Sequence, residues 1–474
     1  MSNGTLQQLA SKGVQDGHLS ISPETSFFKR TYKRVSNYAI ESIDQQVPSI
    51  AWDKSFVVQM SRNGDLLAEL WLVMDIKLCR LNAPAADTVH WSNALGHAML
   101  KDASLEIGNN TIDGVTGLYL EIKHELESTV DIDTNELVYR STNANQLINW
   151  TNNGNTKDLD GASFSQIYVK LPFYFAKARS QALPVIALQY HDIRVKFTLR
   201  SKDDLLVFSN AANKTLNATN NGDIQTCYLM ANFVYLDTME RRLFASNAHE
   251  YLLKNIQVSD FHTKATGAGK MHANVTFNHP VTVFYWVCQK QSNIDANDYF
   301  NYELTTGLGD DPLLTATITF NGSKREKERG PLYWRKIVPG LYFQRTPRKN
   351  LYCYSFAQHP ATWYPSGSVN LSRIDNCALD FVFATVDANG VAYGAAEISI
   401  ICENFNVIRI QGGMAAKDYV KKLETFFTKH LAVEHTNVRP HITGSGELLR
   451  ASCTSPSLKK LVTNSGNTTS LICA

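Results

Sequence analysis

Hydrophobic and polar residues alternate along much of the chain, which is the pattern of strands with one buried face. In the stretch HDIRVKFTLR (191–200), Ile193, Val195 and Phe197 fall on one face, and charged residues fall on the other. Three further segments are β-rich in the same way: 68–81, 377–386 and 397–410. The pattern predicts a chain built mainly from antiparallel strands.

Turn-forming sequences such as RNGD (62–65) and DANG (387–390) separate these strands, and many short strands between turns favour β-sandwiches. Helical patterns are few. The segment 237–253 predicts a helix with Asp237 or Thr238 as its N-cap. Because it lies near the midpoint of the chain, this helix suits a connector between two β-domains.

A second helix is predicted over 415–431. Four apolar residues recur there with helical spacing and form a stripe that needs a partner surface: Val420, Leu423, Phe427 and Leu431. From about residue 440 the chain is rich in Ser, Thr, Asn and Gly, and we expect a poorly ordered tail. Long polar stretches at 141–163 and 292–311 interrupt the strands and suggest functional loops.

Length, composition and charge narrow the classes of protein. A chain of 474 residues is too long for a single domain with one ordinary core. Its 44% hydrophobic residues are enough to form packed cores. The 46 basic and 44 acidic side chains nearly balance, which argues against a dedicated nucleic-acid surface. No apolar run approaches the roughly 20 residues of a membrane helix, and no secretory signal is visible. We therefore expect a soluble protein made in the cytosol.

The cysteines point to a reducing compartment. The chain has eight, and none of them forms a C-x-x-C motif. Four lie in apolar runs with the character of strands: Cys227, Cys288, Cys353 and Cys402. They are predicted to be buried, reduced thiols.

Motifs of catalysis and of cofactor binding are missing from the sequence. It has no G-x-S-x-G, no H-E-x-x-H and no glycine-rich nucleotide loop. The thirteen histidines are scattered, so hydrogen-bonded or exposed histidines are favoured over a metal site. No catalytic residue, metal or cofactor is predicted.

Three polar segments remain as candidate sites. In PSGSVNLSRIDN (365–376) we expect a bend at Pro365 to Ser368 into a strand, with Arg373 and Asp375 on one strand face and able to pair. The charged run SKREKERG (323–330) favours a solvated loop or an inter-subunit contact over a nucleic-acid patch.

The segment FFKRTYKR (27–34) mixes basic and aromatic residues. It suits either a structural entry strand or a contact with nucleic acid or an anionic membrane surface. Its candidate contact residues are Phe28, Lys29, Arg30, Tyr32 and Arg34.

Nine segments, in order from about residue 12 to residue 414, closely resemble the major capsid proteins of nucleocytoplasmic large DNA viruses, such as iridoviruses, phycodnaviruses and marseilleviruses. Among them are KGVQDGHLSISPETSFFKRTYKRVSNYAIESI (12–43), SRNGDLLAELWLVMDIKL (61–78), YSFAQHPATWYPSGSVNLSRIDN (354–376) and NVIRIQGGM (406–414). The long polar loops match nothing in the family, and the residues after Met414 extend beyond its usual end.

The resemblance implies an all-β double jelly roll of two eight-stranded antiparallel sandwiches. The expected parts are an N-terminal base segment (1–24), a first jelly roll (25–236), a short helical connector (237–249), a second jelly roll (250–414) and a C-terminal helical extension (415–474). The helix of this extension is expected to dock on the base of its own chain or on a neighbouring capsid component.

The resemblance also implies a structural role in the virion. Three chains are expected to form a homotrimeric, pseudo-hexagonal capsomer that contacts neighbouring capsomers, minor capsid proteins and penton proteins in an icosahedral shell assembled in the host cytoplasm. The base is expected to face an internal viral membrane, and no specific nucleic acid is implied. Two alternatives stay open: a transient membrane-shaping scaffold and a carbohydrate-binding jelly-roll protein.

Overall fold

The computed structural model describes residues 3–16, 22–24, 26–29, 32–47, 50–77, 79–81, 88–92, 94–127, 149–151, 164–208, 215–259, 262–267, 269–302, 311, 313–385 and 394–417. Strands dominate these residues and pair antiparallel, as the alternation predicted. No helix among them is long and apolar enough to span a membrane.

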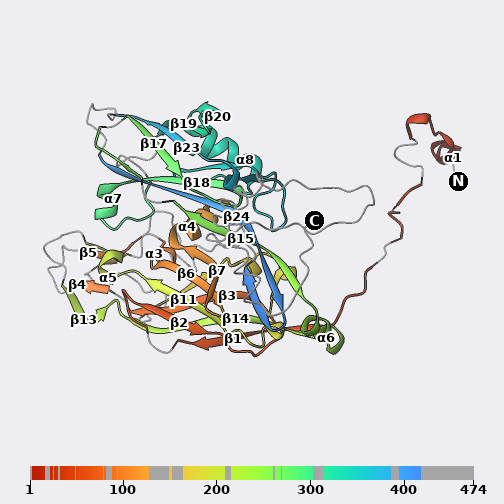
Figure 1. Cartoon of the computed structure of the whole chain (residues 1–474), viewed down its shortest axis with the longest axis horizontal. Coiled ribbons are helices and arrows are strands. Elements are labelled where there is room, and N and C mark those ends of the chain that lie inside the picture. The colour runs from red at the N-terminus through yellow and green to blue at the C-terminus, as the bar shows by residue number, and fades with distance from the viewer. Residues whose placement is uncertain are drawn as a thin grey trace, which may run out of the picture. The chain divides into compact units, whose positions relative to one another are not determined.

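The first half of the chain forms a sandwich of two sheets (Figure 1). One sheet has the order β1-β14-β3-β10, with β9 also paired to β3; its strands are β1 (Tyr38–Gln46), β3 (Leu66–Lys77), β9 (Phe164–Lys170), β10 (Leu183–Pro184) and β14 (Ile224–Leu236). The other has the order β2-β11-β6-β7; its strands are β2 (Ser55–Gln59), β6 (Leu100–Ile107), β7 (Asn110–Thr116) and β11 (Ile193–Leu199).

The second half repeats this strand order. The sheet β15-β24-β18-β21 contains β15 (His249–Val258), β18 (Pro280–Lys290), β21 (Leu351–Ser355) and β24 (Ala396–Gln411), with β16 (His262–Lys264), β22 (Val369–Asn370) and β25 (Met414–Lys417) at its ends. The sheet β17-β23-β19-β20 contains β17 (Lys270–Val275), β19 (Leu313–Phe320), β20 (Ser323–Arg329) and β23 (Cys377–Phe383). Matched in chain order, β1 corresponds to β15, β7 to β20 and β14 to β24.

Short elements fill the connections. The helices are α1 (Asn3–Ala10), α3 (Leu95–Ala98), α4 (Gly117–Glu127), α5 (Lys202–Leu205), α6 (Thr238–Ser246), α7 (Gln291–Asp295) and α8 (Val338–Tyr342), and a π-helix η6 (Tyr333–Ile337) runs directly into α8. Small sheets are formed by β5 (Thr88–Trp91), β8 (Asn149–Thr151) and β12 (Leu206–Phe208), and by β4 (Cys79–Leu81) and β13 (Leu216–Asn221). Helix α4 follows β7 as η6 follows β20, so these segments are also counterparts.

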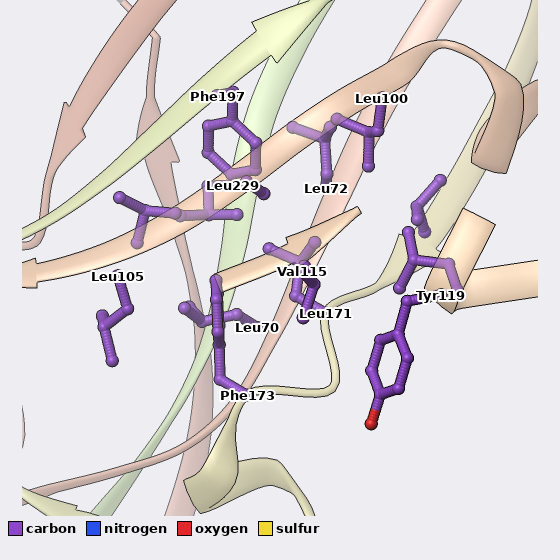
Figure 2. Packing of buried hydrophobic residues seen from close by; sticks show 14 of the residues in the cluster. Leu70, Leu72, Leu100, Leu105, Val115, Tyr119, Leu171, Phe173, Phe197 and Leu229 are labelled. Atoms are coloured by element: carbon purple, nitrogen blue, oxygen red, sulfur yellow. The ribbon is translucent and has the colours of Figure 1, made fainter. Parts of the chain in front are cut away.

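Two clusters of buried side chains stabilise the fold. In the first sandwich, Leu72 of β3 and Leu229 of β14 lie with Leu105 of β6 and Phe197 of β11 (Figure 2). The second cluster fills the second sandwich, with Trp286 of β18 at its centre. The first cluster also takes in residues of the second half, so the two sandwiches share buried surface. Each large apolar side chain buried in this way contributes about 1.5–3 kcal/mol.

The predicted central helix is shorter than the sequence suggested. Asp237 caps it, with its carboxylate accepting a hydrogen bond from the Thr238 N–H at 2.8 Å, but the helix ends at Ser246. From His249 the chain forms β15, because Leu253 is buried in the shared cluster and the backbone pairs with β24. Burial between the sandwiches thus overrides the local helical pattern.

The start of the second predicted helix is also wrong. Residues 415–417 belong to β25, which pairs with β24, so the predicted helix 415–431 does not begin at 415. Val420, Leu423, Phe427 and Leu431 lie outside the described residues, as does the rest of the 415–474 extension after Lys417.

Candidate functional site at the junction of the sandwiches

A buried carboxylate on β24 lies at the centre of the junction. Glu403 has no exposed surface, and its Oε1 lies 2.8 Å from Lys123 Nζ, while its Oε2 lies 2.9 Å from Lys254 Nζ. The hydroxyls of Tyr119 and Tyr285 also donate to Oε1, at 2.9 and 3.1 Å. Helix α4 of the first sandwich supplies Lys123 and Tyr119, and strands β15 and β18 of the second supply the other partners (Figure 1).

The electrostatics follow from burial and pairing. Burial alone would raise the pKa of Glu403, but Lys123 and Lys254 outweigh it and hold that pKa well below its usual range. Burial would lower the pKa of Lys123, yet Glu127 and Glu403 raise it above its ordinary value. Lys177 has its amine near the same cluster, and burial together with Lys254 and Lys123 lowers its pKa to about 8. Glu403 and Lys123 are therefore ionised at neutral pH.

A second set of ionic contacts lies farther along α4. Glu121 is buried; its Oε2 lies 2.7 Å from His97 Nδ1, and its Oε1 pairs with Lys349 of the second half. One turn on, Oε2 of Glu125 accepts a hydrogen bond from the Arg348 backbone N–H at 3.0 Å. The contacts of Glu121 with Lys349 and of Glu125 with Arg348 join α4 to the segment that precedes β21.

This arrangement is suited to fixing geometry. A buried ion pair contributes little net stability, but removing one partner leaves an uncompensated charge. Such contacts therefore penalise any other placement of the two sandwiches. Among the described residues, no group of three or more His, Cys, Asp or Glu side chains is placed to hold a metal.

The junction was not predicted from the sequence. Glu403 lies in the apolar strand segment 397–410, and a charged residue in such a run was the available signal. Its partner Lys123 is about 280 positions away in the chain, so no local pattern links the two residues.

The basic and aromatic segment 27–34 is exposed where it is described. Phe28 is 99% and Tyr32 85% exposed, and Lys29 and Arg34 are exposed as well. Arg30 lies outside the described residues. Large aromatic side chains left in water are typical of a surface that another molecule covers.

The strand face predicted for Arg373 and Asp375 is wrong, because both residues precede β23. The bend is present, since Gly367 has φ +131° and any side chain there would meet the Phe356 carbonyl. After β22, however, the Asn370 side chain accepts a hydrogen bond from the Ser372 N–H and starts a 3-10 turn that ends at Arg373. Neither Arg373 nor Asp375 forms an ion pair with any described residue.

The cysteine prediction is confirmed for the residues described. Cys227, Cys288, Cys353 and Cys402 are buried free thiols, as is Cys377. Burial raises the pKa of the Cys227 thiol to about 12, which makes it inert at neutral pH.

Comparison with known proteins gives the family. The family described as "Large eukaryotic DNA virus major capsid protein" matches residues 240–416, and "Major capsid protein N-terminus" matches residues 26–237. The major capsid protein of Paramecium bursaria Chlorella virus 1 is 30% identical over 462 residues, covering 88% of this chain and 99% of that protein. That of Pyramimonas orientalis virus is 28% identical over 443 residues, with the same coverage.

Solved structures agree. A chain of the quasi-atomic model of the PBCV-1 virus capsid has a TM-score of 0.69 and 26% identity, and the match covers 84% of this chain and 100% of that chain. The Faustovirus major capsid protein, at 11% identity, shares the fold with a TM-score of 0.63 over 86% of this chain and 96% of its own. The double jelly roll is thereby confirmed. Chain, fold and relatives agree that this protein belongs to the family of major capsid proteins of large eukaryotic DNA viruses, and that it forms the capsid.

Proposed function

We propose that three copies of this chain form a pseudo-hexagonal capsomer, and that these capsomers tile an icosahedral shell. The observation that carries the proposal is the repeated strand order of the two sandwiches, which the buried junction holds together. Three such chains offer six similar units around one axis, which suits a lattice of near six-fold symmetry. The role is one of assembly and requires no catalytic step.

The interfaces of such a shell differ in strength. A permanent contact between copies in a trimer typically buries roughly 2,000 Å² or more. Contacts between neighbouring capsomers can be weaker one by one, because many of them act together over the shell.

The measured mass tests the trimer. Light scattering of the purified protein at micromolar concentration should give three times the 53.0 kDa of one chain. A folded, strictly monomeric protein would contradict the proposal.

We further propose that the N-terminal segment contacts components inside the shell. Phe27, Phe28 and Tyr32 are at least 85% exposed, and basic side chains lie among them. This chemistry suits the internal viral membrane or the minor capsid and penton proteins. Deleting residues 1–37 should leave the protein trimeric while reducing its incorporation into particles; normal incorporation would count against the contact.

The C-terminal extension is proposed to support particle assembly. Because Lys417 is the last residue of β25, a truncation that removes 418–474 spares that strand. It should impair particles in the host cytoplasm more than it impairs the trimer. Shells of normal number and stability would show the proposal to be wrong.

A further inference from the structure

The outer face of the second sandwich is covered within the chain. Along β18, Phe284 and Trp286 lie in the core of this sandwich, whereas Val283 and Tyr285 belong to the cluster shared with the first half. Glu403 of the neighbouring strand β24 is on the same face and takes Lys123 from α4. This sheet face therefore has no contact with solvent at its centre.

The corresponding face of the first sandwich is open. Strand β1 pairs only with β14 among the described strands, and on it Tyr38 is 54% and Ile40 44% exposed. The next strands contribute Asn232 and Glu69, which are half-buried. Together with Ile40, Lys177 and Arg179, these two residues line a surface cavity of about 140 Å³.

Elements of the first half cover the β15-β24-β18 face, and their counterparts in the second half are exposed. Within the chain, β7 contacts β15, where the Asn255 side chain donates to the Ile112 carbonyl at 3.2 Å, and α4 reaches β24. Their counterparts are β20, whose residues are almost all exposed, and the η6–α8 segment. On that segment, Leu332, Ile337 and Leu341 are 61%, 52% and 69% exposed.

The two edge strands that border these open surfaces differ in charge. Strand β20 (SKREKER) has four basic and two acidic side chains, of which Arg329 and Glu326 pair with each other. Strand β1 (YAIESIDQQ) has two acidic side chains and no basic one, and its register with β14 places Asp44 on the face of Ile40 and Glu41 on the opposite face. Lys324 and Lys327 are exposed and form no ion pair with any described residue, so they are available to a second molecule.

We infer that β20 and the η6–α8 segment of one copy dock on β1 and the outer face of the β1-β14-β3 sheet of a second copy, repeating between chains the contact that β7 and α4 make within one chain. The inference rests on the proposed trimer and specifies its surfaces. Leu332, Ile337 and Leu341 supply the apolar centre, and Lys324 and Lys327 lie opposite Asp44 of β1. In the free chain these charges are exposed to water, whereas those of Glu403 and Lys123 are buried, so salt screens the attraction between the two copies.

Charge reversal tests the inference. Lys324→Glu with Lys327→Glu, or Asp44→Lys, should each raise the concentration at which half the trimer dissociates by about tenfold or more. The chain that carries all three substitutions restores opposite charges and should recover most of the affinity. Lys270→Glu on β17, an exposed strand at the edge opposite β20, is the matched control and should change little.

Three outcomes are distinguishable by light scattering and circular dichroism. The inference is supported if the two reversal variants keep wild-type spectra but form a weaker trimer, and if the threefold variant recovers the trimer. A wild-type trimer that the reversals leave intact overturns it while the proposed function survives. A wild-type protein that stays monomeric removes both.

Discussion

The side chain on which the junction depends is Glu403, which has no exposed surface and two lysine partners. Glu403→Gln keeps the shape but leaves Lys123 and Lys254 without a full counter-charge. We expect the free energy of unfolding to fall by about 3–5 kcal/mol, measured by denaturant titration.

The control is Glu250→Gln. Glu250 pairs with Arg409 at 2.7 Å, but both side chains are more than half exposed. Solvent screens such a pair, so its loss should cost about 0–1 kcal/mol. Equal losses in the two variants would show that the buried junction has no special role.

A histidine on α4 makes stability dependent on pH. Burial is the main cause that lowers the pKa of His124 below its ordinary 6.5; His97 and Lys349 add to it, while Glu121 and Glu125 oppose it. The unfolded chain therefore binds the proton first, and stability is lost as the pH falls below 6.5. His124→Asn should flatten the fall of the unfolding midpoint between pH 7 and pH 5. If the midpoint falls with pH as steeply as in the wild type, His124 is not a source of the pH dependence.

At the scale of elements, the start of α4 depends on a glycine. A side chain at Gly117 would press into the carbonyl oxygens of His97 and Leu100. We expect Gly117→Ala to displace α4, to destabilise the fold by about 1–3 kcal/mol or more, and to lower the yield of soluble protein. Gly340→Ala in α8, where the nearest atom is 3.7 Å away, should be tolerated. Equal yields and melting temperatures would contradict this view of α4.

The elements also show what the sequence can predict. Alternation located β11 and β23 because their inner faces pack on a single core. It failed at β15, where Leu253 is buried by another domain, and at Arg373, where the Asn370 side chain ends the strand. The junction itself was beyond prediction, because Lys123 and Glu403 meet only after both sandwiches have formed.

At the scale of the molecule, the shared cluster should make unfolding cooperative. Val283, Tyr285 and Ile401 of the second half are buried with the core of the first, so neither half can open without exposing them. Calorimetry of the whole chain should therefore show one transition for the two sandwiches. Two well-separated transitions would mean that they are independently stable.

In the proposed trimer, the two outer sheet faces also differ in when they meet a partner. The face that carries Glu403 is covered by the same chain during folding, at an effective concentration that no dilution can lower. The face that carries Ile40 stays exposed to solvent after the chain has folded, and its acidic and polar side chains keep the protein soluble until a second copy binds. Substitutions that make the Ile40 face as apolar as the Glu403 face would strengthen the contact between chains. In the cell, however, such a face would cause the protein to aggregate before it assembles.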